Sequence, residues 1–317
     1  MKRTVGLVGG RGYTGAELLA LVNRHPQLKL AFASSTSQAG RAISDVCPGW
    51  PHDGAVLVGM SPETCGDHEA DAWVLAVPNG QAAAWAAAIR RNHPDAVILD
   101  LSADHRFDRD WAYGLPERFR AEIRQSRQIA NPGCYATGSQ LGLLPVKDYL
   151  VGTPVIFGVS GYSGAGRKPS DKNDPERLRE NLLPYQLSGH VHEKEISHQL
   201  AMNVRFMPHV TSFFRGISLT ISAQVDHEAS PDKLYRVYGD AYRNEPRIKV
   251  LREIPEVQAV RDTPDAHVGG FAVDERDPSR FSVVVALDNL AKGAASQAIQ
   301  NLNLALGLVE NTGIENE

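Results

Sequence analysis

The chain has 317 residues, of which 42% are hydrophobic and 22% are charged, and this composition is typical of a globular protein with a sizeable core. A formal net charge of −4 with mixed signs gives no reason to expect nucleic acid or an anionic membrane as a partner. No apolar run approaches the ~20 residues of a transmembrane helix, and 3 cysteines do not make a disulfide framework in a chain of this length. We therefore expect a soluble, cytoplasmic protein with reduced thiols and, from its length, two domains.

The N-terminal segment has the pattern of a dinucleotide-binding unit. Residues 4–8 read as an apolar strand, a glycine-rich loop follows, and apolar residues then recur at helical spacing as far as His25-Pro26. Glycines in such a loop let the backbone approach a pyrophosphate, whose charge the helix N-terminus stabilises. A tight strand-to-helix turn without a ligand is the alternative. The residues that we expect to contact the cofactor here are Gly9, Gly12, Tyr13, Thr14 and Gly15.

The end of the second strand, residues 28–33, indicates which dinucleotide binds. An NAD site usually has Asp or Glu about 20 residues past the glycines, where it binds the ribose 2′-hydroxyl. This chain instead has Ser34 and Ser35, followed by Arg41. Hydroxyls and a guanidinium suit a 2′-phosphate, which a carboxylate would repel. We expect NADP(H), and a polar turn with a solvated arginine is the alternative.

Two more buried strands, residues 72–77 and 96–100, continue the alternation of strands and helices. This alternation predicts a Rossmann-type parallel sheet covered by helices on both faces. Ligands of such sheets bind at the carboxyl edge. We therefore place Pro78 at the cofactor and expect Arg106 to hold an anionic group of the substrate, unless it forms a structural ion pair with Asp100 or Asp104.

Cys134 follows an apolar strand end and the turn Asn131-Pro132-Gly133, and a helical pattern begins directly after it. The free N–H groups and the dipole of a helix N-terminus favour a thiolate, so we expect the pKa of this thiol to be lowered. Such a thiolate is a nucleophile for covalent catalysis. A small buried cysteine that packs as an apolar residue is the alternative.

After residue 150 the pattern changes to longer strands, residues 153–160, 218–225 and 281–287, with wide polar loops. We expect a second, α+β domain with a mostly antiparallel sheet over residues 151–288. The first domain then comprises residues 1–150 and a C-terminal helix within 289–317. A Gly/Ser-rich loop after the first of these strands suits phosphate or the nicotinamide, and a flexible surface loop is the alternative. Its candidate residues, with two from the C-terminal segment that we expect near the cofactor, are Ser160, Gly161, Ser163, Gly164, Ala165, Asn289 and Lys292.

His190 and His192 are the histidines that we expect to work with Cys134, since a thiol nucleophile and its histidine usually meet only in the fold. Histidine exchanges protons near neutral pH, and Glu195 lies close by in the sequence. A metal site completed by His198 or Glu195 is an alternative, although the spacing matches no zinc pattern and a pair of cysteine ligands is missing. We expect no metal. Two solvated histidines are the remaining alternative.

These motifs together resemble the N-acetyl-γ-glutamyl-phosphate reductases, relatives of aspartate-semialdehyde and glyceraldehyde-3-phosphate dehydrogenases. The resemblance runs from end to end. It rests on residues 12–18, 101–106, 113–117, 131–135, 160–166, 189–192, 208–210, 215–217 and 292–295. One departure is that the family commonly reads Gly-His-Arg-His with a proline before the glutamate, whereas this chain has Val191 and Glu193-Lys194.

The resemblance implies a reaction and roles for several residues. Cys134 would attack an acyl phosphate to give a thioester, and NADPH would reduce it to N-acetylglutamate semialdehyde in arginine biosynthesis. His190 would be the acid/base residue, with His192 and Glu195 close by, while Asn131, Ser160, Gly161 and Arg106 would contact the substrate. Which histidine is the base stays open. The partners are then small molecules (the acyl phosphate, the semialdehyde and inorganic phosphate), and the assembly a homodimer or homotetramer.

Three other functions remain open at this stage. A lysine-pathway relative reduces an acyl phosphate one carbon longer, and a single methylene changes affinity by only ~1–3 kcal/mol. A non-catalytic NADP-binding regulator and a metal-dependent hydrolase that uses His190, His192 and His198 are the alternatives from other classes.

Overall fold

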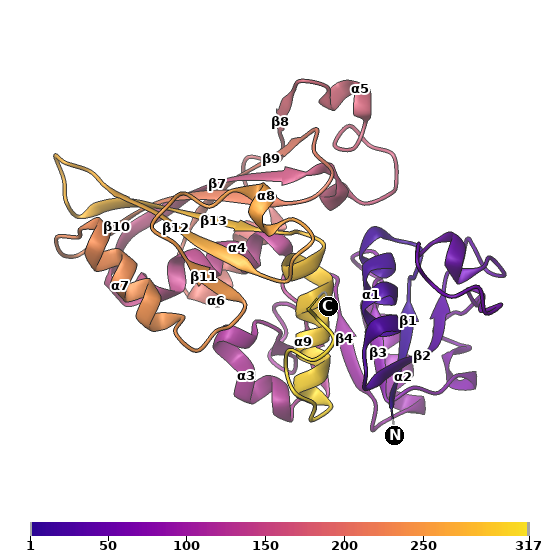
Figure 1. Ribbon diagram of the computed structural model, residues 1–317. Helices are drawn as coiled ribbons and strands as arrows, with labels where there is room; N and C mark the ends of the chain where they lie inside the picture. The colour runs from indigo at the N-terminus through magenta and orange to yellow at the C-terminus, as the bar shows by residue number, and fades with distance from the viewer. Residues whose placement is uncertain (1, 316–317) are drawn as a thin grey trace. The chain divides into compact units, whose positions relative to one another are not determined.

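The computed structural model describes residues 2–315, which form two compact units (Figure 1). Unit 1 comprises the chain up to Gly133 and from Ala294 onward, and unit 2 is Cys134–Gly293. The first boundary lies earlier than the expected residue 150, because the helix that begins at Cys134 packs in the core of unit 2. The second lies later than residue 288, because Asn289 bonds Ser163 and Gly293 bonds Asp288, all within unit 2.

Unit 1 contains a six-stranded parallel sheet with the strand order β2-β1-β3-β4-β6-β5. The strands at its centre are short apolar runs that are buried along their whole length, as parallel strands covered on both faces must be. The order reverses direction between β1 and β3, which is the switch point where such sheets bind ligands. The strands are β1 (Arg3–Val8), β2 (Leu28–Ser34), β3 (Ala72–Leu75), β4 (Val97–Asp100), β5 (Ala112–Tyr113) and β6 (Gln128–Ala130).

Helices cover both faces of this sheet. One hydrophobic cluster joins the sheet to α1 (Tyr13–Arg24), α3 (Pro116–Gln125) and α9 (Ser296–Ala305). A second cluster joins the opposite side chains of the strands to α2 (Ala82–Asn92). The C-terminal helix α9 belongs to unit 1 and lies beside α3 and β4 (Figure 1). Two short 3₁₀ turns, η1 (Ile43–Asp45) and η2 (Cys65–Asp67), complete the unit.

Unit 2 contains a seven-stranded mixed sheet with the order β11-β12-β13-β10-β7-β9-β8. The β11–β12 and β7–β9 pairs are parallel and the other neighbours are antiparallel, as expected for a mostly antiparallel sheet. The strands are β7 (Leu150–Gly161), β8 (Leu182–Pro184), β9 (Arg205–Thr211), β10 (Ile217–Val225), β11 (Ile248–Val250), β12 (Ala266–Val273) and β13 (Arg280–Leu287).

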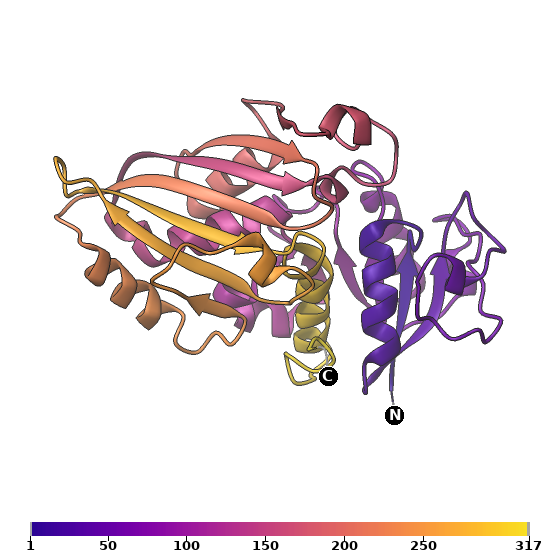
Figure 2. The same ribbon diagram turned by 45° about the horizontal axis from the view of Figure 1, so that its top comes forward.

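Helices α4 (Cys134–Leu143), α6 (Val191–Leu200) and α7 (Pro231–Ala241) of unit 2 pack on one face of its sheet, and Figure 2 shows α4, in magenta, behind the strands. The central helix is α4 (Cys134–Leu143), which approaches the sheet closely because it presents glycines there. A Cβ at Gly138 would lie 2.5 Å from Leu219, and one at Gly142 would lie 2.4 Å from Ile221. The other helical elements are η3 (Leu144–Tyr149), η4 (Tyr162–Ala165), α5 (Pro175–Leu178), α6 (Val191–Leu200), α7 (Pro231–Ala241), α8 (Val257–Val260) and the π-helix η5 (Ala291–Ala295).

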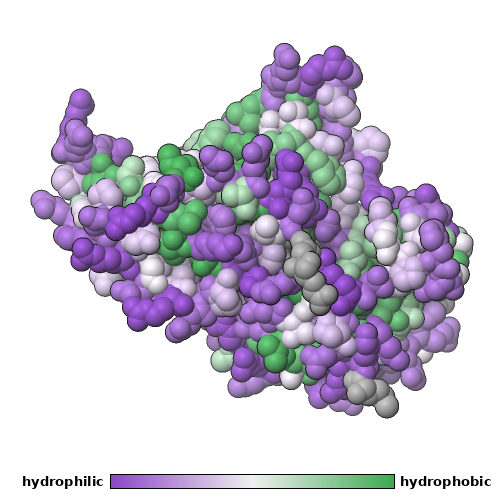
Figure 3. Space-filling model, viewed as in Figure 1, coloured by the Kyte–Doolittle hydropathy of each residue, from purple (hydrophilic) through white to green (hydrophobic). Residues whose placement is uncertain are grey.

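The opposite face of the same sheet is open. Along β10 buried and exposed residues alternate, and the exposed ones lie on this face. On β7 the exposed side chains include apolar ones, Val155 and Phe157, each 37% exposed. Figure 3 shows apolar side chains at the surface in the region of β7 to β9. A sheet face of this kind is suited to association with another surface.

Several elements are not among the expected ones, notably α3, α7, β9 and β12. Within residues 2–315, no helix has the length and apolar character needed to cross a membrane.

Candidate active site

The glycine loop after β1 forms a cradle at the switch point of the parallel sheet. Gly9 has a φ of +94°, and a Cβ there would lie 2.2 Å from the carbonyl oxygen of Ala76. A Cβ at Gly15 would lie 2.7 Å from the carbonyl oxygen of Gly10. Gly12, by contrast, has nothing within 4 Å of such a Cβ, and no side chain caps the start of α1. The helix N-terminus therefore faces open space, where Tyr13 and Thr14 form its first turn, and this arrangement suits a bound pyrophosphate.

The serines expected at the cofactor lie at the end of β2, and both are buried. The carbonyl oxygen of Ser34 accepts hydrogen bonds from the N–H groups of Gly9 and Gly10, which ties the end of β2 to the glycine loop. Arg41 lies farther along, with its Nε 3.3 Å from the carboxylate of Asp45. Both of these side chains are about half exposed, so the pair is open to competition from an anion.

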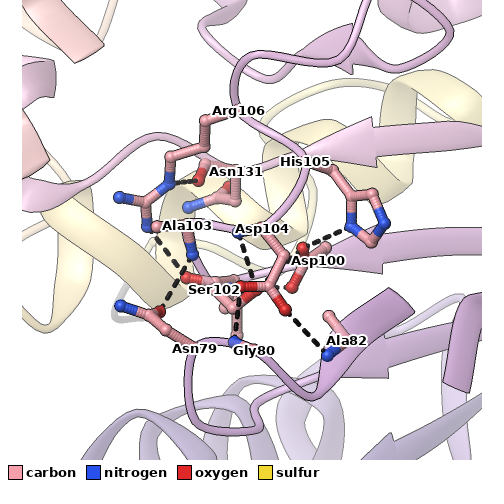
Figure 4. A network of polar contacts seen from close by, with 11 residues as sticks. Asn79, Gly80, Ala82, Asp100, Ser102, Ala103, Asp104, His105, Arg106 and Asn131 are labelled. Atoms are coloured by element: carbon pink, nitrogen blue, oxygen red, sulfur yellow. Dashed lines mark hydrogen bonds and ion pairs between the residues drawn. The ribbon is translucent and has the colours of Figure 1, made fainter. Parts of the chain in front are cut away.

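A network of hydrogen bonds connects the loop after β3 to the loop after β4 (Figure 4). The carboxylate of Asp104 accepts from the N–H groups of Gly80, at 2.7 Å, and Ala82, at 2.9 Å. In return the side-chain oxygen of Asn79 accepts from the N–H of Ala103 at 3.0 Å. Pro78, the exposed residue expected at the cofactor, precedes Asn79. The loops after β3 and β4 therefore fix each other's position.

The carboxylate of Asp100 organises the second of these loops. It is fully buried and accepts from the N–H and hydroxyl of Ser102 and from Nδ1 of His105, the last at 2.7 Å. The His105 ring stacks on Trp111 with 3.9 Å between centroids. These contacts fix the backbone that carries Arg106.

Arg106 is buried and bonds backbone carbonyls. Its Nε donates to the carbonyl oxygen of Asn131 at 3.0 Å, and Nη2 donates to that of Leu101 at 2.9 Å. The side-chain oxygen of Asn131 accepts from Asn301 of α9 at 3.0 Å. Arg106 and Asn131, both expected at the substrate, thus lie together at the carboxyl edge of the sheet (Figure 4).

Cys134 is the first residue of α4 and its side chain is partly exposed. Cys47 and Cys65 are buried, and this burial raises the pKa of both thiols. A Cβ at Gly293 would lie 2.7 Å from the Cβ of Cys134, so a glycine is needed where η5 passes the cysteine. Of the three thiols, Cys134 alone combines access with a helix N-terminus, which favours the thiolate.

His190 and His192 lie next to each other at the start of α6, with 4.9 Å between ring centroids. His190 is the N-cap, and its Nδ1 accepts the N–H of His192 at 3.1 Å. Burial is the main cause that lowers the pKa of His190 to about 4, Lys172 adds to it and Glu193 opposes it. A ring whose Nδ1 accepts a backbone N–H carries its proton on Nε2. His190 is therefore neutral near pH 7, with Nε2–H as a donor.

Two tyrosines connect the histidines to the cysteine. The Tyr185 ring lies 5.7 Å from that of His190, and the Tyr135 ring lies 5.7 Å from that of His192. Burial raises the pKa of both tyrosines, and the charge of Cys134 raises both further. The thiol thus lies within electrostatic reach of both rings. Tyr185 is a site residue absent from the sequence-based expectations, because nothing in its local sequence sets it apart.

The loop after β7 is held by Asn289. Its Nδ2 donates to the hydroxyl of Ser163 at 2.9 Å, and its Oδ1 accepts the N–H of Gly216 at 2.7 Å. Beside it, Asp288 binds the Nε of Arg215 at 2.6 Å. The remaining residues expected in this region are Ser160 and Lys292, which are buried, and Gly161, Gly164 and Ala165 in the same loop.

Glu195 is fully buried on α6. Among residues 2–315, no three His, Cys, Asp or Glu side chains are grouped so that they could hold a metal ion.

Comparison with known proteins agrees with this geometry. The family described as "Semialdehyde dehydrogenase, NAD binding domain" matches residues 4–126, and "Semialdehyde dehydrogenase, dimerisation domain" matches residues 134–289. An N-acetyl-gamma-glutamyl-phosphate reductase of Stenotrophomonas maltophilia is 48% identical over 98% of both chains, and one of Xanthomonas campestris is 46% identical over the same share. "Bifunctional protein argC, mitochondrial" of Dictyostelium discoideum is 45% identical, and this chain spans 37% of its length.

Among solved structures, aspartate semialdehyde dehydrogenase II of Vibrio cholerae matches with a TM-score of 0.75 at 18% identity, over 96% of this chain and 98% of that one. The Candida albicans aspartate semialdehyde dehydrogenase with NADP has a TM-score of 0.73 at 16% identity, over the same shares of the two chains. These two share the fold. The near-full-length identity to the reductases shows that this chain belongs to the N-acetyl-γ-glutamyl-phosphate reductase family of semialdehyde dehydrogenases.

Proposed function

We propose that this chain catalyses the NADPH-dependent reduction of N-acetyl-γ-glutamyl phosphate to N-acetylglutamate 5-semialdehyde, with release of phosphate, in arginine biosynthesis. The observation that carries the proposal is the partly exposed Cys134 at the start of α4, beside the aromatic cluster that holds His190 and His192. The names of the full-length relatives support the same reaction. They do not favour the lysine-pathway alternative or a non-catalytic regulator.

Cys134 acts as the nucleophile. The helix N-terminus stabilises its thiolate, which attacks the acyl carbon, and the bond from carbon to the phosphate oxygen then breaks with its electron pair leaving on phosphate. The product is a thioester on the protein. The backbone N–H of Cys134 is suited to stabilise the oxyanion that forms during attack.

His190 acts as a neutral hydrogen-bond donor. Its Nδ1 is occupied by the backbone N–H of His192, so Nε2–H is the group available to the reacting atoms. Neither thiolate attack nor collapse of the reduced adduct to aldehyde and thiolate requires net proton transfer once the thiol is ionised. A donor that stabilises the oxyanion in both steps is therefore sufficient, and we assign this role to His190, with His192 and the buried Glu195 supporting its position.

The residues of unit 1 fit NADPH. The open space at Gly12 matches a pyrophosphate, and Ser34, Ser35 and Arg41 would bind the 2′-phosphate. When bound, NADPH supplies the hydride that reduces the thioester. The other residues that would hold the cofactor are Gly9, Tyr13, Thr14, Gly15, Pro78, Ser163, Gly164, Ala165, Asn289 and Lys292.

The residues that would bind the acyl chain are Arg106, Asn131, Ser160 and Gly161. Arg106 is buried and held by two carbonyl bonds, so its guanidinium is positioned before a ligand arrives. A positioned guanidinium suits a carboxylate or phosphate.

We further propose that the chain forms a homodimer or homotetramer in the cytoplasm. The open face of the unit 2 sheet, in a segment that matches a dimerisation domain, supports self-association. The three cysteines form no disulfide, and this suits a reducing compartment.

The test is phosphate-dependent reduction of NADP⁺ by N-acetylglutamate semialdehyde, the reverse reaction. Cys134→Ala should abolish it, because no thioester forms, and Cys47→Ala should leave it within twofold of wild type. Activity that survives in Cys134→Ala would rule out the covalent mechanism. Alkylation of Cys134 with and without the semialdehyde, followed by mass spectrometry, checks that substrate protects this thiol.

Turnover of the two acyl phosphates, N-acetylglutamyl and the one-carbon-longer aminoadipyl compound, compares the proposed substrate with the lysine-pathway one. A higher kcat/KM for the longer compound would contradict the assignment.

A further inference from the structure

The loop between η4 and β8 is ordered by its own hydrogen bonds. Asn173 accepts the N–H of Ser170 at 2.7 Å, and its Nδ2 donates to the carbonyl oxygens of Gly166 and Lys168, each at 2.8 Å. Asp174 then caps α5 by accepting the N–H of Glu176 at 3.0 Å. These bonds fix the backbone on the C-terminal side of Lys172, a residue that no sequence motif singles out.

Lys172 lies over the aromatic cluster next to the nucleophile. Its Nζ is 4.7 Å from the centroid of the Tyr185 ring, a cation–π contact. The same ring contacts His190 and lies within electrostatic reach of Cys134. The Tyr185 ring is therefore the common neighbour of the Lys172 ammonium and the His190 ring, and it also lies within electrostatic reach of Cys134.

The other groups around His190 do not neutralise this ammonium. Glu193 of α6 is the nearby carboxylate, but its two oxygens accept the N–H groups of Gly189, at 3.0 Å, and Phe206, at 2.9 Å. His192, Tyr185 and Phe206 are the remaining ring neighbours of His190. Lys172 forms no ion pair with any carboxylate within residues 2–315. A partly buried cation without a counter-ion, beside a tyrosine that is within electrostatic reach of the proposed nucleophile, is a candidate site for an anionic group.

We propose that Lys172 binds the phosphoryl group of the acyl phosphate and holds phosphate as it leaves. This assignment rests on the proposed function. As the thiolate attacks, the bond from carbon to oxygen breaks and its electron pair stays on the phosphate, whose negative charge grows. An ammonium on the Tyr185 ring, close to His190, is suited to stabilise that charge. In the reverse direction it holds inorganic phosphate for attack on the thioester.

Lys172 has a second effect that can be measured separately. Its charge adds to burial in lowering the pKa of His190. Removal of the charge should let that pKa rise toward its ordinary value, although burial continues to lower it. A lysine that served only to pack against Tyr185 would leave the titration of His190 unchanged when methionine replaced it.

The experiment measures the phosphate-dependent reduction of NADP⁺ by N-acetylglutamate semialdehyde in Lys172→Met, Lys172→Arg and Lys194→Met. We expect Lys172→Met to raise the KM for inorganic phosphate by about tenfold or more, the effect of losing one charge-assisted contact, with the KM for semialdehyde within twofold of wild type. Lys172→Arg should restore most of the phosphate affinity. Lys194→Met, which removes the same charge from an exposed position on α6, is the matched control and should behave as wild type.

An unchanged phosphate KM in Lys172→Met, or a rise in the semialdehyde KM instead, would overturn the proposal; the second result would mean that Lys172 binds the substrate carboxylate. In support, the acid limb of the pH profile should move to higher pH in Lys172→Met and stay in place in Lys172→Arg. Absence of phosphate-dependent activity in the wild-type protein would sink the proposed function itself. If the wild-type protein is active and Lys172→Met has an unchanged KM for inorganic phosphate, only the role of Lys172 is refuted.

Discussion

At the scale of single residues, His190 shows how a backbone hydrogen bond determines which ring nitrogen of a histidine carries the proton. Its Nδ1 caps α6 by accepting the N–H of His192, and the ring is 7% exposed. A proton on Nδ1 would point at that N–H, and burial penalises the charged ring. Burial is the main cause that lowers the pKa of His190, and the charge of Lys172 adds to it. The low pKa makes an uncharged donor of a residue that could otherwise be a cation near neutral pH.

The lowered pKa predicts how stability depends on pH. Unfolded His190 titrates near 6.5 and the folded residue near 4, so between these values only the unfolded state binds the proton. The free energy of unfolding should therefore fall as the pH falls through this window, by at most about 1.4 kcal/mol per pH unit for this one group. His190→Asn keeps a cap acceptor and removes the titration. Urea unfolding at several pH values should show that the free energy of unfolding depends less on pH in the variant than in the wild type. Equal pH dependence in the two proteins would contradict the lowered pKa of His190.

Arg41 and Asp45 give a prediction about cofactor choice. If Arg41 binds the 2′-phosphate of NADPH as proposed, that phosphate competes with the Asp45 carboxylate, which lies 3.3 Å from Arg41. Arg41→Ala should raise the KM for NADPH severalfold and leave that for NADH nearly unchanged. Asp45→Asn should lower the KM for NADPH, by up to about fivefold, because an exposed ion pair contributes about 0–1 kcal/mol. A KM for NADPH that fell in Arg41→Ala and rose in Asp45→Asn would show that Arg41 does not bind the 2′-phosphate.

At the scale of elements, two loops of unit 1 depend on one carboxylate. Asp104, on the loop after β4, accepts the N–H groups of Gly80 and Ala82 at the start of α2. Asp104 therefore caps α2 although it lies on a different loop of the chain. The loop that carries Arg106 and the loop that carries Pro78 therefore cannot move independently (Figure 4).

Asp104→Asn tests this connection. An amide has one acceptor oxygen, so one of the two N–H groups loses its partner, and we expect the free energy of unfolding to fall by about 1 kcal/mol. The KM values for cofactor and substrate should rise together, since both loops shift. Asp110→Asn, in the same segment but exposed, is the control and should alter neither quantity. An effect on one KM alone would argue against a shared anchor.

The close approach of α4 to the sheet of unit 2 gives a stability prediction. Gly142→Ala should destabilise the protein by about 1–3 kcal/mol through overpacking against Ile221, which outweighs the gain in helix propensity. Gly239 in α7 is the matched control, because a Cβ there meets nothing within 4 Å. Gly239→Ala should stabilise by about 0.5–1 kcal/mol. Chemical denaturation of the two variants checks the pair, and a stabilised Gly142→Ala would refute the packing argument.

At the scale of the whole molecule, the open face of the unit 2 sheet gives a prediction about assembly. Phe157 stands on this face and is 37% exposed. If the face joins two copies, Phe157→Lys places a charge in the interface and should shift the protein toward monomer. Val309→Lys, at a position in unit 1 that is 73% exposed, should leave the mass unchanged in light scattering. A mass unaffected by Phe157→Lys would exclude this face.

The local sequence determined the elements whose signals are local. The glycine loop, the short apolar strands of the parallel sheet and the turn before Cys134 are read from spacing and turn chemistry, and each appears in the structure as expected. The division of the chain was less exact, since α4 and η5 belong to the unit whose core they fill.

Only the tertiary structure decided which side chains act on one another. Lys172 and Tyr185 approach His190 from the loop before α5 and from the residue after β8. Asp104 caps a helix from a different loop, and Asn289 bonds Ser163. Spacing along the chain carries no information about these pairs, because long-range contacts depend on how whole elements pack. The sequence alone indicated the chemistry that a residue type can perform. It did not indicate the neighbouring side chains that set the pKa and the position of that residue.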